Sequence, residues 1–247
     1  MKNLICAVRA GLLALCLCAA SAHASVVIGG TRVVFPAKNG EVTVRLSNLG
    51  SSPALVEAWI DSGDVHSTPD KVDVPFIVTP PLFRMEANRD QSLRIIGTPS
   101  QLPADRESLF WLNVLEVPPK PTGLEAEGKN TLQFAIRSRL KLFYRPANLA
   151  GDPLKAPASI TWKVVADGKG FALEARNPTP YYVTFTNVSI SVNGTTYAAE
   201  TGMVAPQGSL QLPVKGLAQA PANGTSIDYT AINDYGASAA LKGAISP

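Results

Sequence analysis

Cysteine and histidine, which often supply catalytic and metal-binding groups, are nearly absent from this sequence. The 247 residues include three cysteines and two histidines, and only His66 of these five lies beyond position 24. The chain after position 24 therefore has no disulfide, no thiol nucleophile and no cysteine-based zinc site. His66 lies in a polar stretch between Asp64 and Pro69 that is typical of a solvated loop. Since a Ser–His–Asp triad would have to use this histidine, the sequence argues against such a hydrolase.

Charge is also scarce, and the common ligand-binding motifs are missing. Only 17% of the residues are charged, and the formal net charge is +3. A basic nucleic-acid-binding protein is therefore not expected. The sequence has no glycine-rich phosphate loop, no His-Glu-x-x-His motif and no calcium loop, so neither a cofactor nor a metal is expected. Its 19 acidic residues form no pattern that singles out a catalytic pair, although a secreted β-rich enzyme remains an alternative.

The first 24 residues have the pattern of a secretory signal peptide. Lys2 and Arg9 provide the positive start, Ala10–Ala20 is an apolar run, and Ala22–Ala24 fits the small-x-small cleavage pattern. A membrane anchor is the alternative, but the run is shorter than the roughly 20 residues that cross a bilayer. We predict cleavage after Ala24, which leaves 223 residues with a formal charge of +1. The product would be exported and free of cysteine.

Alternation of polar and apolar residues predicts β-strands over most of the chain. The clearest segments are Glu41–Ser47, Gln91–Ile95, Ser108–Val117 and Thr184–Val192. Asn193-Gly194 follows the last of these segments and predicts a tight hairpin turn, because both residues tolerate a positive φ. Candidate helices are few. The sequence is therefore expected to form an all-β fold, an antiparallel sandwich or barrel.

A Pro/Gly-flanked polar stretch from Arg145 to Pro153 indicates a domain boundary. We predict a signal peptide over residues 1–24, a first domain over 25–147 and a second over 148–247. Each predicted domain has about the 100 residues that are common for immunoglobulin-like sandwiches.

The segment Leu132–Tyr144 alternates over an unusual length. Its even positions are Leu132, Phe134, Ile136, Ser138, Leu140, Leu142 and Tyr144. At about 3.3 Å per residue, one strand would span roughly 40 Å and is expected to run from the first domain into the second. The preceding Pro118–Asn130 stretch is polar and rich in proline and glycine, and is expected to be a mobile loop. The residues alone favour an interior strand, and an edge strand offered to another chain is the alternative.

Six segments, in this order, resemble the PapD-like family of periplasmic pilus assembly chaperones. They are Thr31–Pro36, Val78–Arg84, Asp105–Asn113, Leu140–Pro146, Asn177–Tyr182 and Ile232–Gly236. The resemblance covers essentially the whole chain after residue 24. It implies a periplasmic chaperone without enzymatic activity or cofactor, which delivers fimbrial subunits to an outer-membrane usher.

The resemblance also implies an architecture and a binding mode. Two immunoglobulin-like domains would meet in a boomerang shape with a cleft between them. A fimbrial subunit lacks its last strand, and the chaperone would lend its own strand from near Leu132 to Lys141, which is donor-strand complementation. Leu132, Phe134 and Ile136 would then fill the open groove of the subunit.

Two further groups of residues carry over from the family motifs. Arg32 and Lys141 would anchor the terminal carboxylate of the subunit, whereas periodicity alone indicates two ordinary basic residues at strand edges. Glu107, Arg145 and Asp234 would form an ion network that links the two domains. Their wide separation in the sequence gives no sign of a shared location without the resemblance.

A secreted β-sandwich pilus subunit or adhesin is the second hypothesis for function. Such a protein is expected to end in a strand that mates with a chaperone and usually to carry a cysteine pair. This chain ends in Ala240–Pro247 and has no cysteine after position 24. The moderate loop length and the missing cysteine pair favour the short-loop branch of the chaperones. Self-association that caps the lent strand without subunit is another interaction that the resemblance allows.

Overall fold

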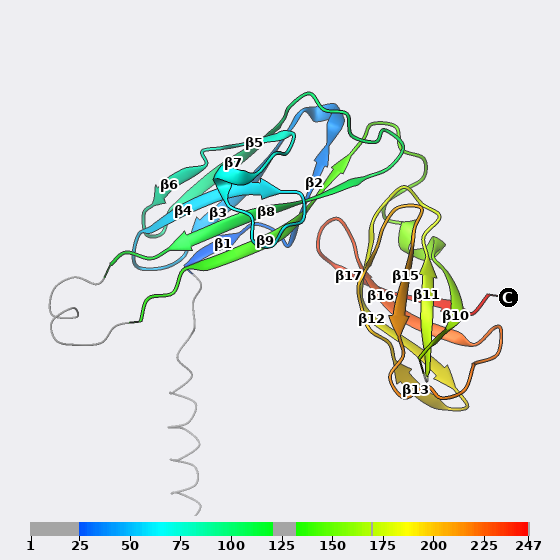
Figure 1. The fold of residues 1–247 in the computed structure, drawn as a ribbon. Coiled ribbons are helices and arrows are strands. Elements are labelled where there is room, and N and C mark those ends of the chain that lie inside the picture. Colours follow the sequence, from blue (N-terminus) through cyan, green and yellow to red (C-terminus); the bar gives the residue numbers. More distant parts are fainter. Residues whose placement is uncertain (1–24, 121–131, 169, 247) are drawn as a thin grey trace, which may run out of the picture.

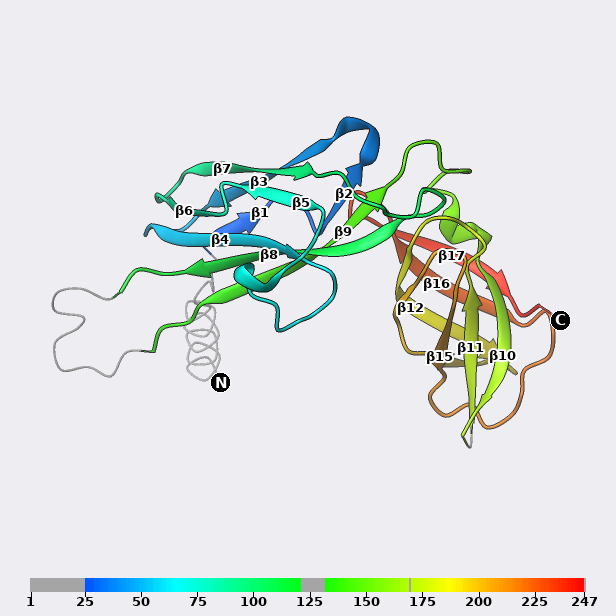
Figure 2. The same cartoon turned by 45° about the horizontal axis from the view of Figure 1, so that its top comes forward.

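The computed structural model describes residues 25–120, 132–168 and 170–246, and these residues form two β-sandwiches (Figure 1). The sandwiches meet at an angle, so the molecule is bent, and β8 and β9 run lengthwise through the first sandwich toward the junction (Figures 1 and 2). The predicted all-β class and the pair of immunoglobulin-like sandwiches are confirmed. The predicted signal peptide, its cleavage after Ala24 and most of the loop Pro118–Asn130 lie outside the described residues.

The first sandwich has a four-stranded and a five-stranded sheet. The strand orders are β1-β3-β7-β5 and β2-β9-β8-β4-β6. Their bounds are β1 (Val26–Ile28), β2 (Arg32–Pro36), β3 (Glu41–Asn48), β4 (Ala54–Asp61), β5 (Phe76–Thr79), β6 (Leu82–Met85), β7 (Asp90–Gly97), β8 (Ser108–Val117) and β9 (Ile136–Arg145). Two short 3-10 helices, η1 (Ala37–Asn39) and η2 (Pro69–Lys71), lie in connections. All pairings are antiparallel except the parallel pair β2–β9.

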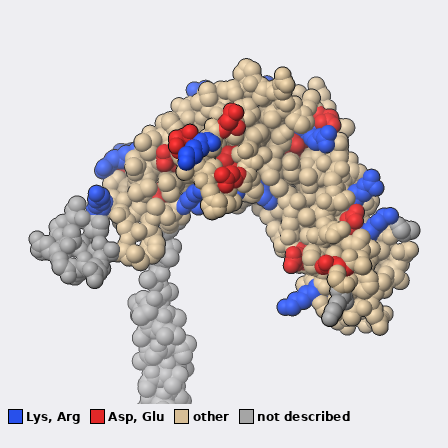
Figure 3. All heavy atoms as spheres, in the orientation of Figure 1, with Lys and Arg blue, Asp and Glu red and all other residues tan. Residues whose placement is uncertain are grey.

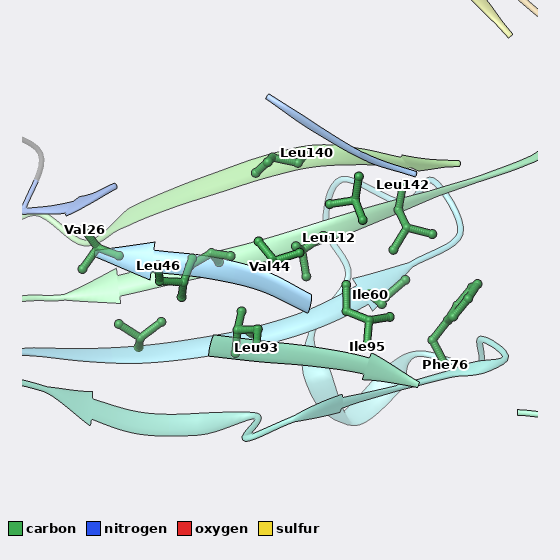
Figure 4. Close-up of a cluster of buried hydrophobic side chains, with 14 of the residues drawn as sticks. Val26, Val44, Leu46, Ile60, Phe76, Leu93, Ile95, Leu112, Leu140 and Leu142 are labelled. Carbon is green, nitrogen blue, oxygen red and sulfur yellow. The ribbon is translucent and has the colours of Figure 1, made fainter. Parts of the chain in front are cut away.

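Alternating apolar side chains from both sheets fill the core of the first sandwich. Leu46 and Leu93 face Leu112 and Leu142 from the opposite sheet, and all four side chains are fully buried (Figure 4). Near the junction the core becomes aromatic. The ring of Phe76 lies 5.2 Å from that of Phe35 between centroids, in an edge-to-face arrangement. The predicted two-residue period of the strands therefore corresponds to one buried face.

The second sandwich has a core of its own. Its sheets have the orders β10-β11-β15 and β13-β12-β16-β17, with β14 pairing β12. The bounds are η4 (Ala156–Ser159), β10 (Thr161–Asp167), β11 (Gly170–Arg176), β12 (Val183–Val192), β13 (Thr195–Ala198), β14 (Met203–Val204), β15 (Ser209–Pro213), β16 (Ser226–Ile232) and β17 (Ser238–Ala244). Trp162, Phe185 and Tyr229 pack together at its centre, with ring centroids 5.1 to 5.8 Å apart. Asn193 and Gly194 have φ of 50° and 80° between β12 and β13, which confirms the predicted hairpin.

The long strand predicted over Leu132–Tyr144 is shorter than expected. β9 begins only at Ile136, whose register partner is Glu116 near the end of β8. β8 ends at Val117, and Pro118 and Pro119 follow, so the ladder stops because proline has no N–H to donate. The side chain of Gln133 instead donates hydrogen bonds to the carbonyl oxygens of both prolines, at 2.7 and 3.0 Å.

The expected continuation of this strand into the second sandwich is also wrong. β9 ends at Arg145, followed by Pro146 and by Asn148, which has a φ of 63°. A left-handed residue after a proline turns the chain away from the strand direction. His66 is exposed in a turn, as predicted, where its backbone N–H donates to the Oδ1 atom of Asp64. In the described part of the chain, no helix is both long and apolar enough to cross a membrane.

Candidate functional site

The concave side of the molecule lies between the two sandwiches. The space-filling view shows a broad hollow there, and the face in view carries acidic and basic side chains in a scattered mixture (Figure 3). β9 runs from the outer end of the first sandwich to the junction with the second (Figure 1). The site residues that the sequence predicts lie on this strand, on the segment directly before it or at the junction.

One edge of β9 is covered along only half of its length. β2 pairs with β9 in parallel, from Arg32 opposite Lys141 to Pro36 opposite Arg145. Residues 136–140 pair with β8 on one side, and no strand of the described chain pairs with them on the other. Unpaired N–H and C=O groups on such an edge are a ready template for another strand. The edge strand considered from the sequence is therefore present over the first half of β9.

The apolar row on this segment changes from exposed to buried along its length. Leu132, Phe134 and Ile136 are 79%, 68% and 47% exposed, whereas Leu140 and Leu142 are 7% and 0% exposed. Leu140 and Leu142 point into the core of the first sandwich (Figure 4). Of the three exposed residues, Leu132 and Phe134 precede β9, and Ile136 is the first residue of its open edge. Such a row of large apolar side chains marks a surface for another apolar partner.

Arg32 and Lys141 lie side by side at the junction, because they are direct register partners on β2 and β9. The Nη1 atom of Arg32 donates to the carbonyl oxygen of Ile232 at 3.2 Å, which joins the two sandwiches. Its buried Nε atom has no hydrogen-bond partner among the described residues. The Nζ atom of Lys141 lies 3.4 Å from the hydroxyl of Thr184. Of the ion pairs formed by the described residues, none includes either cation.

Electrostatics make this pair of cations suited to an anion. Burial lowers the pKa of Arg32 despite the nearby acids Asp234 and Glu107. Burial lowers the pKa of Lys141 as well, and the charge of Arg32 lowers it further. Two half-buried like charges disfavour each other, and an added carboxylate relieves both the repulsion and the lost solvation. Charge-assisted hydrogen bonds to that carboxylate are stronger than neutral ones.

Glu107, Arg145 and Asp234, which the sequence could not bring together by itself, form one contact across the junction. Arg145 donates from Nε to Glu107 at 2.7 Å and from Nη1 and Nη2 to Asp234 at 2.7 and 3.0 Å. Glu107 also accepts from the backbone N–H of Tyr182 at 2.8 Å. Asp234 and Tyr182 belong to the second sandwich, and Arg145 is the last residue of β9. The trio therefore ties the end of β9 to the neighbouring sandwich.

Burial has opposite consequences for the two central members of this network. Glu107 is 3% exposed, and burial raises the pKa of its carboxyl even though Arg145 opposes the shift. Burial acts to lower the pKa of Arg145, but its bonds to Asp234 and the charge of Glu107 outweigh this and hold that pKa above the ordinary value. Arg145 is thus charged at every physiological pH and donates charge-assisted hydrogen bonds to Glu107 and Asp234.

A second group on the other face of β9 was missed by the sequence reasoning. The guanidinium carbons of Arg137 and Arg139 lie 4.9 Å from the ring centroid of Trp59 and 4.2 Å from that of Trp111. Arg139 also pairs with buried Asp61 at 2.5 Å. Such cation–aromatic stacking stiffens the strand from its outer side. The alternating basic residues were visible in the sequence, but their partners on β4 and β8 were not.

Nothing in the described ranges collects three or more histidine, cysteine, aspartate or glutamate side chains into a possible metal site. The site on and beside β9 combines an open strand edge, a row of exposed apolar side chains and a pair of cations. Its chemistry is suited to hold an extended peptide and a carboxylate.

Comparison with known proteins places the chain in a family. Residues 25–150 match the model for the pili and flagellar-assembly chaperone PapD N-terminal domain, and residues 155–242 match the model for the pili assembly chaperone PapD C-terminal domain. The chaperone protein FimB/FhaD of Bordetella pertussis is 49% identical over 222 residues, which cover 88% of this chain and 87% of that protein.

Solved structures agree with these matches. The crystal structure of the YadV chaperone has a TM-score of 0.76 and 40% identity, and covers 90% of this chain and 100% of that one. The SafB chaperone, solved in complex with the Salmonella enterica SafA pilin, has a TM-score of 0.73 at 30% identity, with 92% and 99% covered. These likenesses favour the chaperone over the alternative of a pilus subunit or adhesin. The chain belongs to the PapD family of pili assembly chaperones.

Proposed function

We propose that this chaperone binds a fimbrial subunit by lending it the start of β9. The subunit adds its strand edge to the open edge of residues 136–140 and receives Leu132, Phe134 and Ile136 in its groove. Burial of each large apolar side chain contributes about 1.5–3 kcal/mol. The chaperone acts by binding and not by catalysis, and it needs no cofactor.

The anchor of this complex is the cation pair. Arg32 and Lys141 hold the terminal carboxylate of the subunit and so fix the register of the added strand, since a one-residue slip would turn every side chain to the other face. Glu107, Arg145 and Asp234 keep the junction at the angle that this geometry needs. The single observation that carries the proposal is the coincidence of an open strand edge with an exposed apolar row that leads toward two cations free of acidic partners among the described residues.

Several parts of the biological setting belong to the same proposal. Homologous fimbrial chaperones are periplasmic. Export of this chain to that compartment would be accompanied by cleavage after Ala24, which removes residues 1–24. Residues 25–147 and 148–247 form its two domains, and each hydrophobic core stays within one of these ranges. An outer-membrane usher receives the loaded subunit. In the absence of subunit, self-association caps the exposed row.

Co-purification from the periplasm tests the anchor. The chaperone is tagged at its C-terminus and expressed with a fimbrial subunit encoded beside it, and the captured subunit is quantified by mass spectrometry. Arg32→Ala and Lys141→Ala should each lower the captured amount about tenfold or more, because hydrogen bonds to charged groups contribute about 1.5–3 kcal/mol. Arg45→Ala on β3 and Lys163→Ala on β10 remove exposed basic residues of the same types and serve as matched controls.

The proposed anchor is wrong if the Arg32 and Lys141 variants fold and capture subunit as well as the two controls do. Circular dichroism and thermal unfolding of each variant show whether the fold is intact. A Phe134→Asp, Ile136→Asp double variant tests the lent strand separately, because it places two uncompensated charges in the groove of the subunit. Unchanged capture by that variant would rule out the lent row.

A further inference from the structure

Glu116 occupies a position on β8 where the alternation calls for an apolar residue. The core-facing side chains of this strand are Phe110, Leu112, Val114 and then Glu116, which is only 8% exposed. A carboxylate at such a position is rare unless polar or charged partners hold it. The partners of Glu116 therefore call for explanation.

The start of the opposite sheet provides those partners. The backbone N–H of Val26, the first residue of β1, donates to the Oε2 atom of Glu116 at 3.1 Å. The hydroxyl of Ser25 donates to the Oε1 atom. None of the ion pairs found in residues 25–120, 132–168 and 170–246 includes Glu116. A carboxylate has about four acceptor sites, so these two bonds leave capacity for a charged donor.

The backbone nitrogen of Ser25 is tied by covalent bonds to both groups that contact this carboxylate. It belongs to the residue whose hydroxyl already bonds to Oε1, and it precedes by one residue the N–H that bonds to Oε2. Covalent geometry therefore keeps it within about one residue length, roughly 3.8 Å, of groups that contact the carboxylate. In an unprocessed chain this nitrogen is a neutral amide.

We infer that Glu116 is the receptor for the α-ammonium group that removal of residues 1–24 creates on Ser25. The inference rests on the cleavage site in the proposed function. A signal peptidase adds one water across the Ala24–Ser25 peptide bond, so that Ala24 leaves with the carboxylate and Ser25 keeps the amine. That amine takes up a proton at neutral pH and becomes a cation. Processing thereby converts a buried carboxylate with neutral partners into an ion pair that joins β1 to β8.

This ion pair lies beside the segment that the chaperone lends. Glu116 is the register partner of Ile136, the first residue of β9. Ser25, Glu116, Phe134 and Ile136 also line one surface groove. Fastening β1 to β8 at this point stabilises the end of the sandwich from which the lent segment extends. Maturation of the N-terminus is therefore coupled to order at the donor edge.

A double-mutant cycle on the N-terminus and Glu116 tests the inference. One form is released from a fusion whose protease leaves Ser25 as the first residue, and a second form carries Gly-Gly before Ser25, which moves the charge away. Both forms are made with Glu116 and with Glu116→Gln, and intact mass confirms each terminus. The readout is amide hydrogen exchange at β1, where local opening is measured directly. Gly-Gly should speed exchange of the β1 amides about tenfold, which is about 1.4 kcal/mol, when Glu116 is present.

In the Glu116→Gln background the same extension should change the exchange rate less than twofold, because a neutral amide gains little from the ammonium. Equal acceleration in both backgrounds, or none in either, overturns the inference. So does N-terminal sequencing of the exported protein that finds a first residue other than Ser25. Subunit capture is measured on the same four proteins. Failure of all four proteins to capture subunit would contradict the proposed function. The exchange rates would still decide whether Glu116 binds the ammonium group.

Discussion

The two halves of the apolar row that leads into β9 differ in what covers them and agree in their sequence pattern. Leu140 and Leu142 are buried in the first sandwich, while Leu132 and Phe134 have the same alternation and remain exposed. The difference comes from packing, because Leu140 and Leu142 belong to the buried core cluster of the first sandwich, whereas Leu132 and Phe134 precede β9 and lie outside that cluster. β2 in turn pairs only with Lys141–Arg145, so no second strand of the described chain pairs with residues 136–140. One strand thus serves its own core at one end and offers an edge at the other.

Charge placed at each end of the row should separate these two roles most strongly. Leu142→Asp buries an unpaired carboxylate at a fully buried position and should prevent folding of the first sandwich. Phe134→Asp lies on the exposed half and should leave thermal stability nearly unchanged while subunit capture is lost. Circular dichroism and co-purification measure the two effects. A folded Leu142→Asp protein, or an unfolded Phe134→Asp protein, would break the distinction.

Removal of Arg145 should give the next largest effect. Arg145→Ala leaves the carboxylate of Glu107 buried without its cation, which typically costs about 3–5 kcal/mol. Urea unfolding monitored by tryptophan fluorescence measures this loss. Arg176→Ala removes an exposed arginine on β11 and is the matched control. A loss no larger than that of the control would mean that the junction does not depend on this network.

The anchor at the buried end of β9 should make subunit capture depend on pH. Burial and Arg32 lower the pKa of Lys141, so its charge is lost at a lower pH than that of an ordinary lysine. A bound carboxylate favours the charged form, so capture should be full below this lowered pKa and fall about tenfold as the pH rises through it. Lys141→Arg, which keeps its charge, should move the fall to higher pH. The same profile for both proteins would argue against Lys141 as the anchor.

The smallest effect is expected on the outer face of β9. Arg139→Ala removes a guanidinium that bonds to buried Asp61 and stacks on Trp111. The cost should be only about 1 kcal/mol at neutral pH, because Asp61 keeps its hydrogen bond from Asn113 and its ion pair with Arg137. Despite burial, the bonds from Arg139, Asn113 and the backbone of Gly63 keep the pKa of Asp61 below its usual range. Asp61 therefore contributes stability above its unfolded pKa, and this contribution is lost as the pH falls through the folded pKa. The difference between the parent and Arg139→Ala should shrink over that acidic range, which urea titrations at several pH values would show.

The sequence predicted the parts of the fold that depend on local pattern. Alternation identified β3, β7, β8 and β12, and Asn193-Gly194 identified a hairpin, because strand period and turn chemistry are properties of neighbouring residues. The same alternation could not tell Leu142 from Phe134. Leu142 is buried because it packs in a cluster with Leu46 and Leu93, which come from the opposite sheet and much earlier in the chain, whereas Phe134 lies outside that cluster.

The candidate site shows the same limit. Arg32, Lys141 and the trio around Arg145 were identified only through their family motifs. Pairing of β2 with β9 brings the first two together, and the junction of the two sandwiches brings the trio together, whereas their spacing in the sequence shows neither. Asp61 and Glu116 were missed for a related reason. A single acid in a strand pattern predicts an exposed residue. The partner that explains the burial, Arg139 for Asp61 and Ser25 for Glu116, is visible only in the structure.

Amide hydrogen exchange along β9, compared between the free chaperone and its complex with subunit, tests the lent strand most directly. In the free protein the amides of residues 136–140 that do not bond to β8 should exchange fast, and those that bond to β2 within 141–145 should exchange slowly. Binding of subunit should protect the first group and leave the second unchanged. A complex in which residues 136–140 exchange as fast as in the free chaperone would contradict the account.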